Sequence, residues 1–526
     1  MRETQQQNFL EGLVVQTESI ADIIREQGAN TPSRRAFIEP DREWTFIQLD
    51  ETTNRIATGL IAAGVAAGDT VACLTRSLGA CLLLSVAAAK CGAVSVPLNW
   101  RLKPGEIDYA IRLIEPKVLI MDGGVAEGLA ELALASRMTV LIVDGTDPAT
   151  EFGTWAARHP PQDPNVRVSE GSVAFLMFSS GTTGRPKAVC ITHEGVLAHI
   201  RCWTGPFGFK GEDTVHLNVL PTFHVSGLVN ALWVLGLGGT VITRATFDPA
   251  DFLAAIARYS VTDTFMVPTM LGAILASPKF AVTDLSTLQC IAYGGSPISL
   301  ELLTRCVRTL RCGLRQVYGM TESSGCIALL QPEDHRRGLE HPEILKAAGH
   351  PGAHFDIRIV DPRTGAICGE DQVGEIWVNS CQNFDGYFKD SEATRQAFPE
   401  GRPGWYRTGD AGYLSGGLLY VSDRIKDMII TGGENVYPVE VEQVLATHTA
   451  VRDVAVIGVR DDTWGESVRA CVVLRTGTTS SEDELIAYSR QRIAHYKCPK
   501  SVVFVEEIPR NPSGKILKTV LREKYA

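Results

Sequence analysis

The sequence predicts an α/β protein with a large N-terminal domain and a small α+β C-terminal domain. Through residue 350, short apolar runs alternate with amphipathic helix patterns, which indicates subdomains built on parallel sheets. Beyond residue 350, short β runs separated by Asp, Gly and Pro indicate an antiparallel sheet or a small distorted β-barrel. The final hundred residues form a compact mixture of strands and helices. A chain of 526 residues accommodates these units at roughly 100–200 residues per domain.

The first elements follow from apolar spacing. Residues 17–30 predict a helix, because Ile20, Ile23 and Ile24 share one face and Gly28 marks its end. The next predicted elements are a short strand at 45–47, a helix at 50–63, strands at 71–75 and 93–97 around a helix at 82–91, and a strand at 118–121. The same alternation continues through 214–220, 252–259, 264–267 and 289–293.

The later elements are shorter and change in character. Strands are expected at 357–360, 374–378 and 418–421. The last part predicts a strand at 427–431, a helix at 438–446, strands at 452–460 and 467–474, a helix at 481–495 and a strand at 501–505. We therefore expect a domain boundary near residues 424–427.

Composition and charge exclude several classes of function. The 50 Lys and Arg against 60 Asp and Glu give a formal net charge of -10, which argues against non-specific nucleic-acid binding. The 13 cysteines form no C-x-x-C pair, which is typical of reduced thiols in a cytoplasmic protein. The first residues lack the pattern of a secretory signal. The apolar stretch 225–242 contains Asn230 and four glycines, so a buried helix followed by a strand is favoured over a membrane span.

A strand-like apolar run at 175–178 leads directly into SSGTTGRPK at residues 179–187. Gly181 and Gly184 let backbone amides approach an anion closely, four hydroxyls add donors, and Lys187 adds a positive charge. This combination suits a polyphosphate. It is not a Walker A loop, because Pro186 interrupts the required Gly-Lys pair.

SSGTTGRPK resembles the phosphate loop of the acyl-adenylate-forming (ANL) superfamily, which includes acyl-CoA synthetases (AMP-dependent CoA ligases), coumarate-CoA ligases, firefly luciferases and peptide-synthetase adenylation domains. Further motifs follow in the family's order: YGMTE at 318–322, YRTGD at 406–410, DRIKD at 423–427, GGENVYP at 432–438 and NPSGK at 511–515. The resemblance covers nearly the whole chain. One departure is Ala188, where the family usually has Gly.

The resemblance implies a carboxylic acid-CoA ligase that uses ATP, Mg²⁺ and coenzyme A. A carboxylate would attack the α-phosphate of ATP to give acyl-AMP and pyrophosphate, and the coenzyme A thiol would then take the acyl group and release AMP. The resemblance also implies an adenylation (AMP-binding) domain over residues 1–424 and a mobile C-terminal domain over residues 425–526, with a hinge near Lys426.

The resemblance assigns a nucleotide site. It would consist of Ser179, Ser180, Gly181, Thr182, Thr183, Gly184, Lys187, Gly295, Ser296, Pro297, Tyr318, Gly319, Thr321, Asp410, Arg424 and Lys515. By resemblance, Tyr318 stacks on adenine, while Asp410 and Arg424 meet the ribose hydroxyls. Glu322 and Thr183 are expected at Mg²⁺, a hard cation that prefers oxygen ligands.

Four residues are expected to act on the reacting groups: Lys515, His224, Glu322 and Thr183. Lys515 would neutralise charge that develops between the carboxylate and the α-phosphate. Its place on the small domain implies movement between the half-reactions. The rotated domain would then bring Gly432, Gly433 and Glu434 to the coenzyme A channel.

The acyl pocket is expected to include His224, Val225, Gly227, Trp233, Met266, Gly294, Gly319, Met320 and Cys326. The segment around His224 has no carboxylate to pair with an α-ammonium group, which disfavours amino acids because a buried unpaired ammonium is costly. A roomy apolar pocket fits a hydrophobic acid, and it leaves fatty, aryl, branched and polycyclic acids open.

Alternatives remain at this point. The acyl group could go to the thiol of an acyl-carrier protein, and luciferase-type oxygenation is a weaker alternative. A scaffold without catalysis is disfavoured, since Lys515, Glu322 and Asp410 are all present. The expected partners are a small carboxylic acid and coenzyme A, with no nucleic acid and no integral membrane segment. The oligomeric state stays open, and a homodimer is compatible with the sequence.

Overall fold

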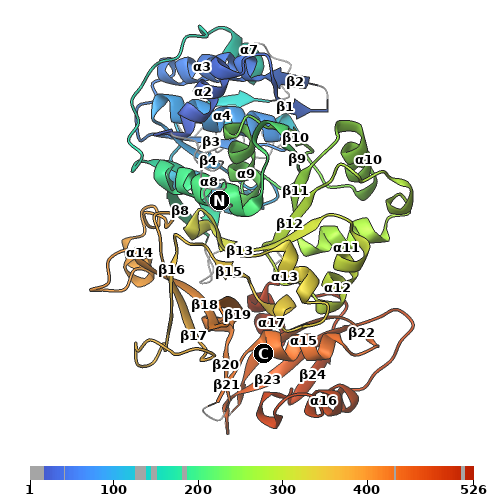
Figure 1. Cartoon of the computed structure of the whole chain (residues 1–526). Coiled ribbons are helices and arrows are strands. Elements are labelled where there is room, and N and C mark those ends of the chain that lie inside the picture. Colours follow the sequence, from blue (N-terminus) through green and yellow to red (C-terminus); the bar gives the residue numbers. More distant parts are fainter. Residues whose placement is uncertain are drawn as a thin grey trace, which may run out of the picture.

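The computed structural model describes residues 17–40, 42–124, 138–143, 151–179, 186–431, 434–461, 463–510 and 516–525. These residues form four sheets with helices packed against them, and the sheet nearest the C-terminus lies at the bottom of Figure 1. Within these ranges no helix combines the length and apolar character needed to cross a membrane.

A six-stranded sheet occupies the first part of the chain. Its strands, in spatial order, are β6 (Thr139–Ile142), β5 (Val118–Met121), β3 (Thr70–Leu74), β4 (Val94–Pro97), β7 (Val173–Ser179) and β8 (Lys187–Thr192). The first five are parallel, whereas β8 returns antiparallel to β7. Its associated helices are α2 (Ile20–Asn30), α3 (Phe46–Ala62), α4 (Leu78–Cys91), α5 (Pro104–Ile114) and α7 (Phe152–Ala157).

The prediction of a strand at 45–47 is wrong. The strand β2 (Arg42–Thr45) ends there, and α3 starts at Phe46. Thr45 and Gln48 form a capping box, in which the Gln48 amide donates to the Thr45 hydroxyl at 3.4 Å and the Thr45 amide donates to the Gln48 side chain at 3.0 Å. This cap starts the helix before the predicted residue 50.

A nine-stranded sheet forms the second layer. In spatial order it contains β15 (His350–Pro351), β14 (Gly325–Leu330), β13 (Gly313–Met320), β12 (Cys290–Gly294), β11 (Asp263–Met266), β9 (Val215–Asn218), β10 (Thr240–Thr243), β1 (Arg35–Glu39) and β2. The strands from β13 to β1 are parallel, and the outer strands are antiparallel. Helices α8 (His193–Phe207), α9 (Val225–Gly236), α10 (Pro249–Tyr259), α11 (Pro268–Ala276), α12 (Leu300–Thr309) and α13 (Pro332–Arg337) accompany it.

The apolar stretch at 225–242 belongs to the core. It forms the buried helix α9 followed by strand β10, as the sequence predicted. Gly238 and Gly239 make the turn between the two elements, and the backbone amide of Gly239 donates to the carbonyl of Val234 at 2.9 Å.

Two smaller sheets complete the fold. Beyond residue 350, β16 (Asp356–Val360), β17 (Gly374–Asn379), β18 (Trp405–Ser415) and β19 (Leu418–Arg424) form an antiparallel sheet, with α14 (Ser391–Ala397) between β17 and β18. The last sheet contains β21 (Glu434–Val436), β20 (Ile429–Thr431), β23 (Gly465–Leu474), β22 (Val451–Asp461) and β24 (Ser501–Phe504), with α15 (Pro438–Ala446), α16 (Glu482–Arg490) and α17 (Lys518–Tyr525).

The helix predicted at 481–495 is shorter than expected. α16 ends at Arg490 and is followed by a turn over residues 491–493. In this turn the Ser489 carbonyl is shared: it accepts an i+3 hydrogen bond from the Arg492 amide at 2.9 Å and an i+4 hydrogen bond from the Ile493 amide at 3.0 Å.

Candidate active site

Several of the predicted nucleotide residues lie where β12 and β13 run side by side. The two strands are parallel, with Gly294 opposite Val317. Residues 295–297 therefore leave β12 beside the end of β13, and Glu322 lies in the turn η3 (Thr321–Ser323) that follows β13. Ligands of parallel α/β sheets commonly bind at these carboxyl ends.

Close backbone contacts explain several glycines of the predicted acyl pocket. A β-carbon added at Gly227, Gly294 or Gly319 would lie between 2.0 and 2.3 Å from a main-chain carbonyl oxygen. Any side chain would push these backbones apart. The glycines therefore bring the segments around the site close together.

The buried residue Asp410 contacts the partly accessible side chains of Tyr318 and Arg424. The Tyr318 hydroxyl donates to Asp410 Oδ2 at 2.7 Å, and Arg424 Nε lies 2.8 Å from Oδ1. The Asp410 carboxylate raises the pKa of Arg424, while burial and the same carboxylate raise the pKa of Tyr318. Tyr318 therefore stays a neutral donor beside a fully charged guanidinium.

Glu322 is held by the segment that follows β17. The Tyr387 hydroxyl donates to Glu322 Oε1 at 3.1 Å, and the backbone amide of Phe384 donates to the Glu322 carbonyl at 2.9 Å. Lys187 Nζ lies 4.8 Å from the centroid of the Tyr387 ring. Burial and Glu322 raise the pKa of Tyr387, so its hydroxyl remains a donor.

The donor set around Glu322 suits a cation held mainly by a nucleotide. Within the described part of the chain, no group of three or more His, Cys, Asp or Glu residues could hold a metal ion. Mg²⁺ is often held by one or two carboxylates together with substrate phosphates and water. Glu322 fits that role, because only its Oε1 accepts a hydrogen bond among the described residues.

Gln382 is a buried residue that sequence reasoning missed. It is 0% exposed, and its Nε2 donates to the Ser323 carbonyl at 2.9 Å and to His199 Nδ1 at 3.3 Å. Its Oε1 accepts from Trp203 Nε1 at 3.1 Å. Burial lowers the pKa of His199 to about 3, so the ring is neutral and can accept. One amide thus joins α8 to the turn that carries Glu322, and nothing local in the sequence signals this.

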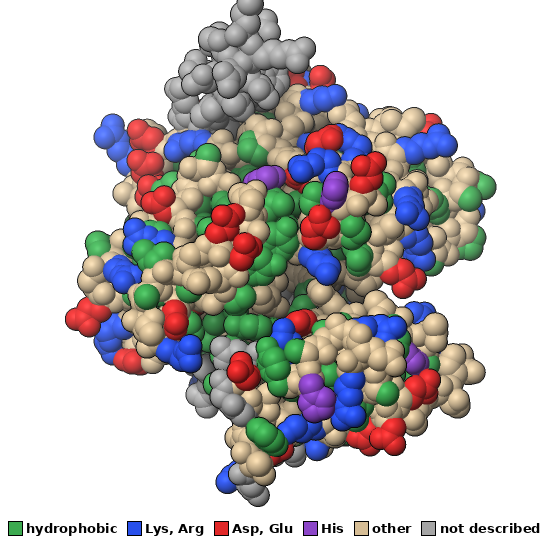
Figure 2. Space-filling model, turned by 60° about the horizontal axis from the view of Figure 1, so that its bottom comes forward, with side chains coloured by type: hydrophobic (Ala, Val, Ile, Leu, Met, Phe, Trp, Pro, Cys, Tyr) green, Lys and Arg blue, Asp and Glu red, His purple; other side chains and the backbone are tan. Residues whose placement is uncertain are grey.

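The predicted acyl-pocket residues differ in how far they are exposed to solvent. His224, Gly319 and Met320 are partly accessible, whereas Val225, Gly227, Trp233, Met266, Gly294 and Cys326 are buried. Trp233 Nε1 donates to Thr204 Oγ1 at 2.9 Å, which fixes its ring within the core. Figure 2 turns the bottom of Figure 1 toward the viewer and shows hydrophobic side chains gathered in a hollow near the middle of this face.

The predicted hinge is anchored by the last helix. Lys518, the first residue of α17, lies 3.7 Å from Asp423 Oδ2 and 3.0 Å from Glu442 Oε1. Burial alone would lower the pKa of Lys518, but the carboxylates of Glu442 and Asp423 raise it, so the ammonium stays charged. The helix that follows the predicted Lys515 is therefore tied to the DRIKD segment.

Lys426 lies in a short turn, η5 (Ile425–Asp427), between β19 and β20. Arg522 of α17 forms an ion pair with Asp427 at 2.8 Å, so a second contact joins α17 to this turn. Glu434 opens β21, three residues after Thr431 ends β20.

Several predicted residues lie outside the described residues: Ser180, Gly181, Thr182, Thr183, Gly184, Gly432, Gly433 and Lys515. Their described neighbours fit the predicted loop, because Ser179 ends β7 directly opposite Lys187 in β8. Ala188 lies within β8 opposite Phe178, and its φ is not positive, so its methyl group causes no backbone strain.

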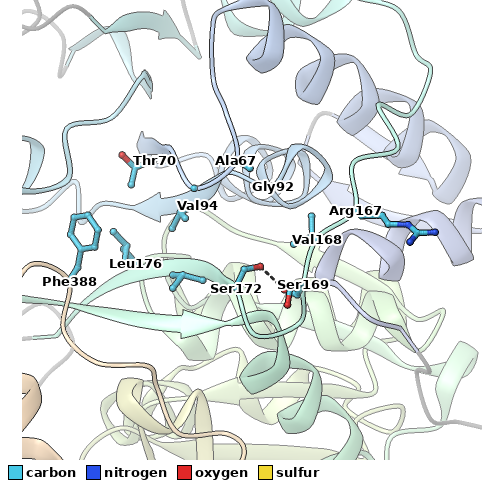
Figure 3. Close-up of a pocket in the computed structure, with 12 residues that line it drawn as sticks. Ala67, Thr70, Gly92, Val94, Arg167, Val168, Ser169, Ser172, Leu176 and Phe388 are labelled. Atoms are coloured by element: carbon cyan, nitrogen blue, oxygen red, sulfur yellow. Dashed lines mark hydrogen bonds between the residues drawn. The ribbon is translucent and has the colours of Figure 1, made fainter.

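A separate cavity of about 360 Å³ opens at the other end of the six-stranded sheet (Figure 3). Thr70 and Val94 line it at the starts of β3 and β4, together with Leu176 and Phe388. Because it lies at the amino ends of parallel strands, it is not where the predicted phosphate loop emerges. We assign no substrate to it.

Known proteins match the chain over most of its length. A family model described as AMP-binding enzyme matches residues 24–388, and one described as AMP-binding enzyme C-terminal domain matches residues 440–515. The long-chain-fatty-acid–CoA ligase FadD13 of Mycobacterium tuberculosis is 35% identical over 520 residues, covering 97% of this chain and 99% of the relative. The feruloyl-CoA synthase of Amycolatopsis sp is 38% identical over 518 residues, covering 95% and 100%.

A solved structure has the same fold. It is o-succinylbenzoate CoA synthetase (MenE) from Bacillus subtilis in complex with the acyl-adenylate intermediate OSB-AMP. The TM-score is 0.83 and the identity 32%, and the match covers 95% of this chain and 97% of that chain.

Proposed function

The chain belongs to the AMP-binding enzyme family and is a carboxylic acid-CoA ligase, and we propose that it activates a hydrophobic carboxylic acid with ATP and Mg²⁺ as acyl-AMP before transfer to coenzyme A. The observation that carries this proposal is the cluster of Asp410, Tyr318 and Arg424 near the end of β13, in which two described side chains orient one buried carboxylate. One relative is named as a long-chain-fatty-acid–CoA ligase and another as a feruloyl-CoA synthase. Both names support a hydrophobic carboxylic acid as the substrate.

Each described residue has a task in the first half-reaction. Asp410 accepts hydrogen bonds from the ribose hydroxyls, and Arg424 orients that carboxylate. Lys187 and Thr321 would contact phosphate oxygens, and Glu322 would hold Mg²⁺, whose charge would offset that of the phosphates. His224 lies directly before α9, at the entrance to the acyl pocket.

The two half-reactions use different orientations of residues 425–526. In the first, Lys515 enters the site and neutralises charge between the carboxylate and the α-phosphate. In the second, rotation about Lys426 withdraws Lys515 and brings residues 432–434 to the coenzyme A channel. The anchoring of α17 to residues 423–427 supports this proposal, because it couples the segment after Lys515 to the hinge.

Pyrophosphate release tests the proposal. The full chain is assayed with ATP, Mg²⁺ and a panel of fatty, aryl and polycyclic acids, with and without coenzyme A. We expect turnover that needs coenzyme A and stops in Lys515→Ala. Lys524→Ala is the matched control, because this lysine is exposed on α17. Pyrophosphate release that coenzyme A does not stimulate would replace this proposal with acyl transfer to a carrier-protein thiol.

A further inference from the structure

The turn that carries Glu322 continues into a backbone conformation that ordinary side chains rarely adopt. Ser324, directly after η3, has a φ of 53°, in the left-handed region. A residue other than glycine in this region costs free energy, and it persists only where the surrounding structure enforces it. Ser323 and Ser324 are both 0% exposed. Contacts with neighbouring segments therefore keep this turn, and Glu322 with it, in place.

Gln382, which follows β17, contacts the turn with both its main chain and its side chain. The Ser324 hydroxyl donates to the backbone carbonyl of Gln382 at 2.8 Å. In the other direction, Gln382 Nε2 donates to the Ser323 carbonyl at 2.9 Å and to the Cys326 carbonyl at 3.4 Å. One residue thus meets the turn before and after its left-handed position.

The opposite end of the Gln382 amide is anchored outside the turn. Its Oε1 accepts from Trp203 Nε1 at 3.1 Å and from His354 Nε2. An indole nitrogen only donates and a main-chain carbonyl only accepts, so the amide has a single possible orientation, with Oε1 toward Trp203 and Nε2 toward Ser323. The amide therefore joins α8 and the segment before β16 to the turn.

His199 of α8 connects Gln382 to the turn by a second route. Gln382 Nε2 also donates to His199 Nδ1 at 3.3 Å. Burial lowers the pKa of His199 to about 3, so the ring stays neutral and accepts this bond. The same ring lies against Gly325, where an added β-carbon would come within 2.6 Å of it. Gln382 thus also fixes the ring against which the end of the turn packs.

Asn383, the next residue, provides a contrast. Its Nδ2 donates to the Val378 carbonyl at 3.2 Å and to the Gly404 carbonyl at 3.1 Å. Val378 lies in β17, and Gly404 directly precedes β18. Two adjacent amides therefore have different tasks, since Asn383 supports its own sheet while Gln382 reaches the turn after Glu322.

We propose that Gln382 is a positioning residue for adenylation, whose amide fixes the turn after β13 so that Glu322 meets the Mg²⁺ that accompanies ATP. This inference rests on the proposed ligase function. Gln382 is 0% exposed, so it touches neither the nucleotide nor the acid and acts through the turn alone. Tyr387 orients the carboxylate of Glu322 directly, whereas Gln382 sets the backbone from which that side chain projects.

The first test measures ATP binding without any acid, so that no turnover occurs. Calorimetry gives the Kd for ATP in Mg²⁺ and in EDTA for the native chain and for Gln382→Met, which has a similar length and no amide. We expect Mg²⁺ to strengthen binding by the native chain and Gln382→Met to lose about twofold to tenfold of that gain. A partly unfolded protein would instead weaken binding equally in both solutions.

The second test measures pyrophosphate release against Mg²⁺ concentration, with an acid that the native chain uses. The half-saturating Mg²⁺ concentration should rise by about twofold to tenfold in Gln382→Met, and excess Mg²⁺ should recover much of the rate. A loss of folded protein would lower the rate at every Mg²⁺ concentration alike. If Gln382→Met does not fold, Gln382→Asn replaces it, since this shorter side chain keeps an amide but withdraws it from the turn.

Asn383→Ala is the matched control. It removes two hydrogen bonds from the adjacent residue, so it should lower the Tm while leaving the effect of Mg²⁺ on both measurements unchanged.

A native effect of Mg²⁺ that persists in full in the Gln382 variant would overturn the inference and leave the ligase proposal standing. A change that Asn383→Ala shares would overturn it too, and so would ATP binding by the native chain that Mg²⁺ does not strengthen. If the native chain released pyrophosphate with no acid of the panel, the ligase proposal and this inference would both fall.

Discussion

The hydroxyl of Tyr387 donates to the carboxylate of Glu322 at 3.1 Å, while the face of the same ring meets Lys187 at 4.8 Å. Tyr387 thus orients the predicted cation ligand and contacts the lysine at the end of the phosphate loop. The two residues it joins come from η3 and β8, which different sheets position.

Tyr387→Phe should raise the Mg²⁺ concentration that adenylation requires. The ring and its contact with Lys187 remain, but the hydrogen bond to Glu322 is lost. Hydrogen bonds to charged groups contribute about 1.5–3 kcal/mol, so adenylation should slow by about tenfold or more. Pyrophosphate release measured against Mg²⁺ concentration should also show a higher requirement. Tyr413→Phe, in a stacked pair with Tyr420, is the control. An unchanged Mg²⁺ dependence would argue against this role of Tyr387.

Lys426→Pro should separate the two half-reactions. Proline fixes φ and removes a backbone donor, so rotation at this turn should be hindered while the adenylation geometry persists. We expect the first-turnover burst of pyrophosphate release to be retained and thioester formation to fall, with both measured on one preparation. Lys426→Ala, which keeps the backbone free, should affect thioester formation less. An equal loss of both half-reactions in Lys426→Pro would place the hinge elsewhere.

Lys518→Met should destabilise the contact between α17 and the hinge. It leaves Asp423 and Glu442 buried without their cation, and breaking a buried pair in this way costs about 3–5 kcal/mol. We expect a lower urea midpoint and faster proteolysis near the C-terminus. Lys524→Met, on the exposed side of the same helix, should leave both unchanged. If Lys518→Met resisted urea and protease as well as the native protein does, the ion pairs would contribute little to stability.

Asp263→Asn should change how stability depends on pH. Asp263 is 9% exposed in β11, and burial raises its pKa to about 6. Because the folded pKa lies above the unfolded value, this side chain favours folding at low pH, and the contribution is lost as pH rises from about 4 to about 6. The substitution should therefore raise stability above pH 6 by roughly 3 kcal/mol and have little effect below pH 4.

The readout for Asp263→Asn is the difference in unfolding free energy between variant and native protein from pH 4 to pH 8. Taking this difference matters because burial lowers the pKa of His216, the neighbour of Asp263 in β9, to about 4. That histidine makes the native protein lose stability as pH falls below about 6.5, which is the opposite dependence. A difference that stays flat across the range would contradict the raised pKa of Asp263.

Sequence patterns alone located many of the strands and some of the helices that the structure describes, because apolar spacing is a local property of the chain; helices α5, α8 and α12 were not predicted. They failed at residues 45–47, where β-favouring side chains coincide with a helix cap made by Thr45 and Gln48. The motifs from SSGTTGRPK to NPSGK likewise indicated the family, because they resemble the family's motifs and follow in the same order along nearly the whole chain.

The tertiary structure alone decided which of those residues are joined by hydrogen bonds. Tyr387 meets Glu322 across 65 residues of sequence, and Gln382 meets His199 across 183. The physical reason is that residue spacing reports local periodicity, whereas hydrogen-bond partners and unsatisfied groups depend on how distant segments pack together.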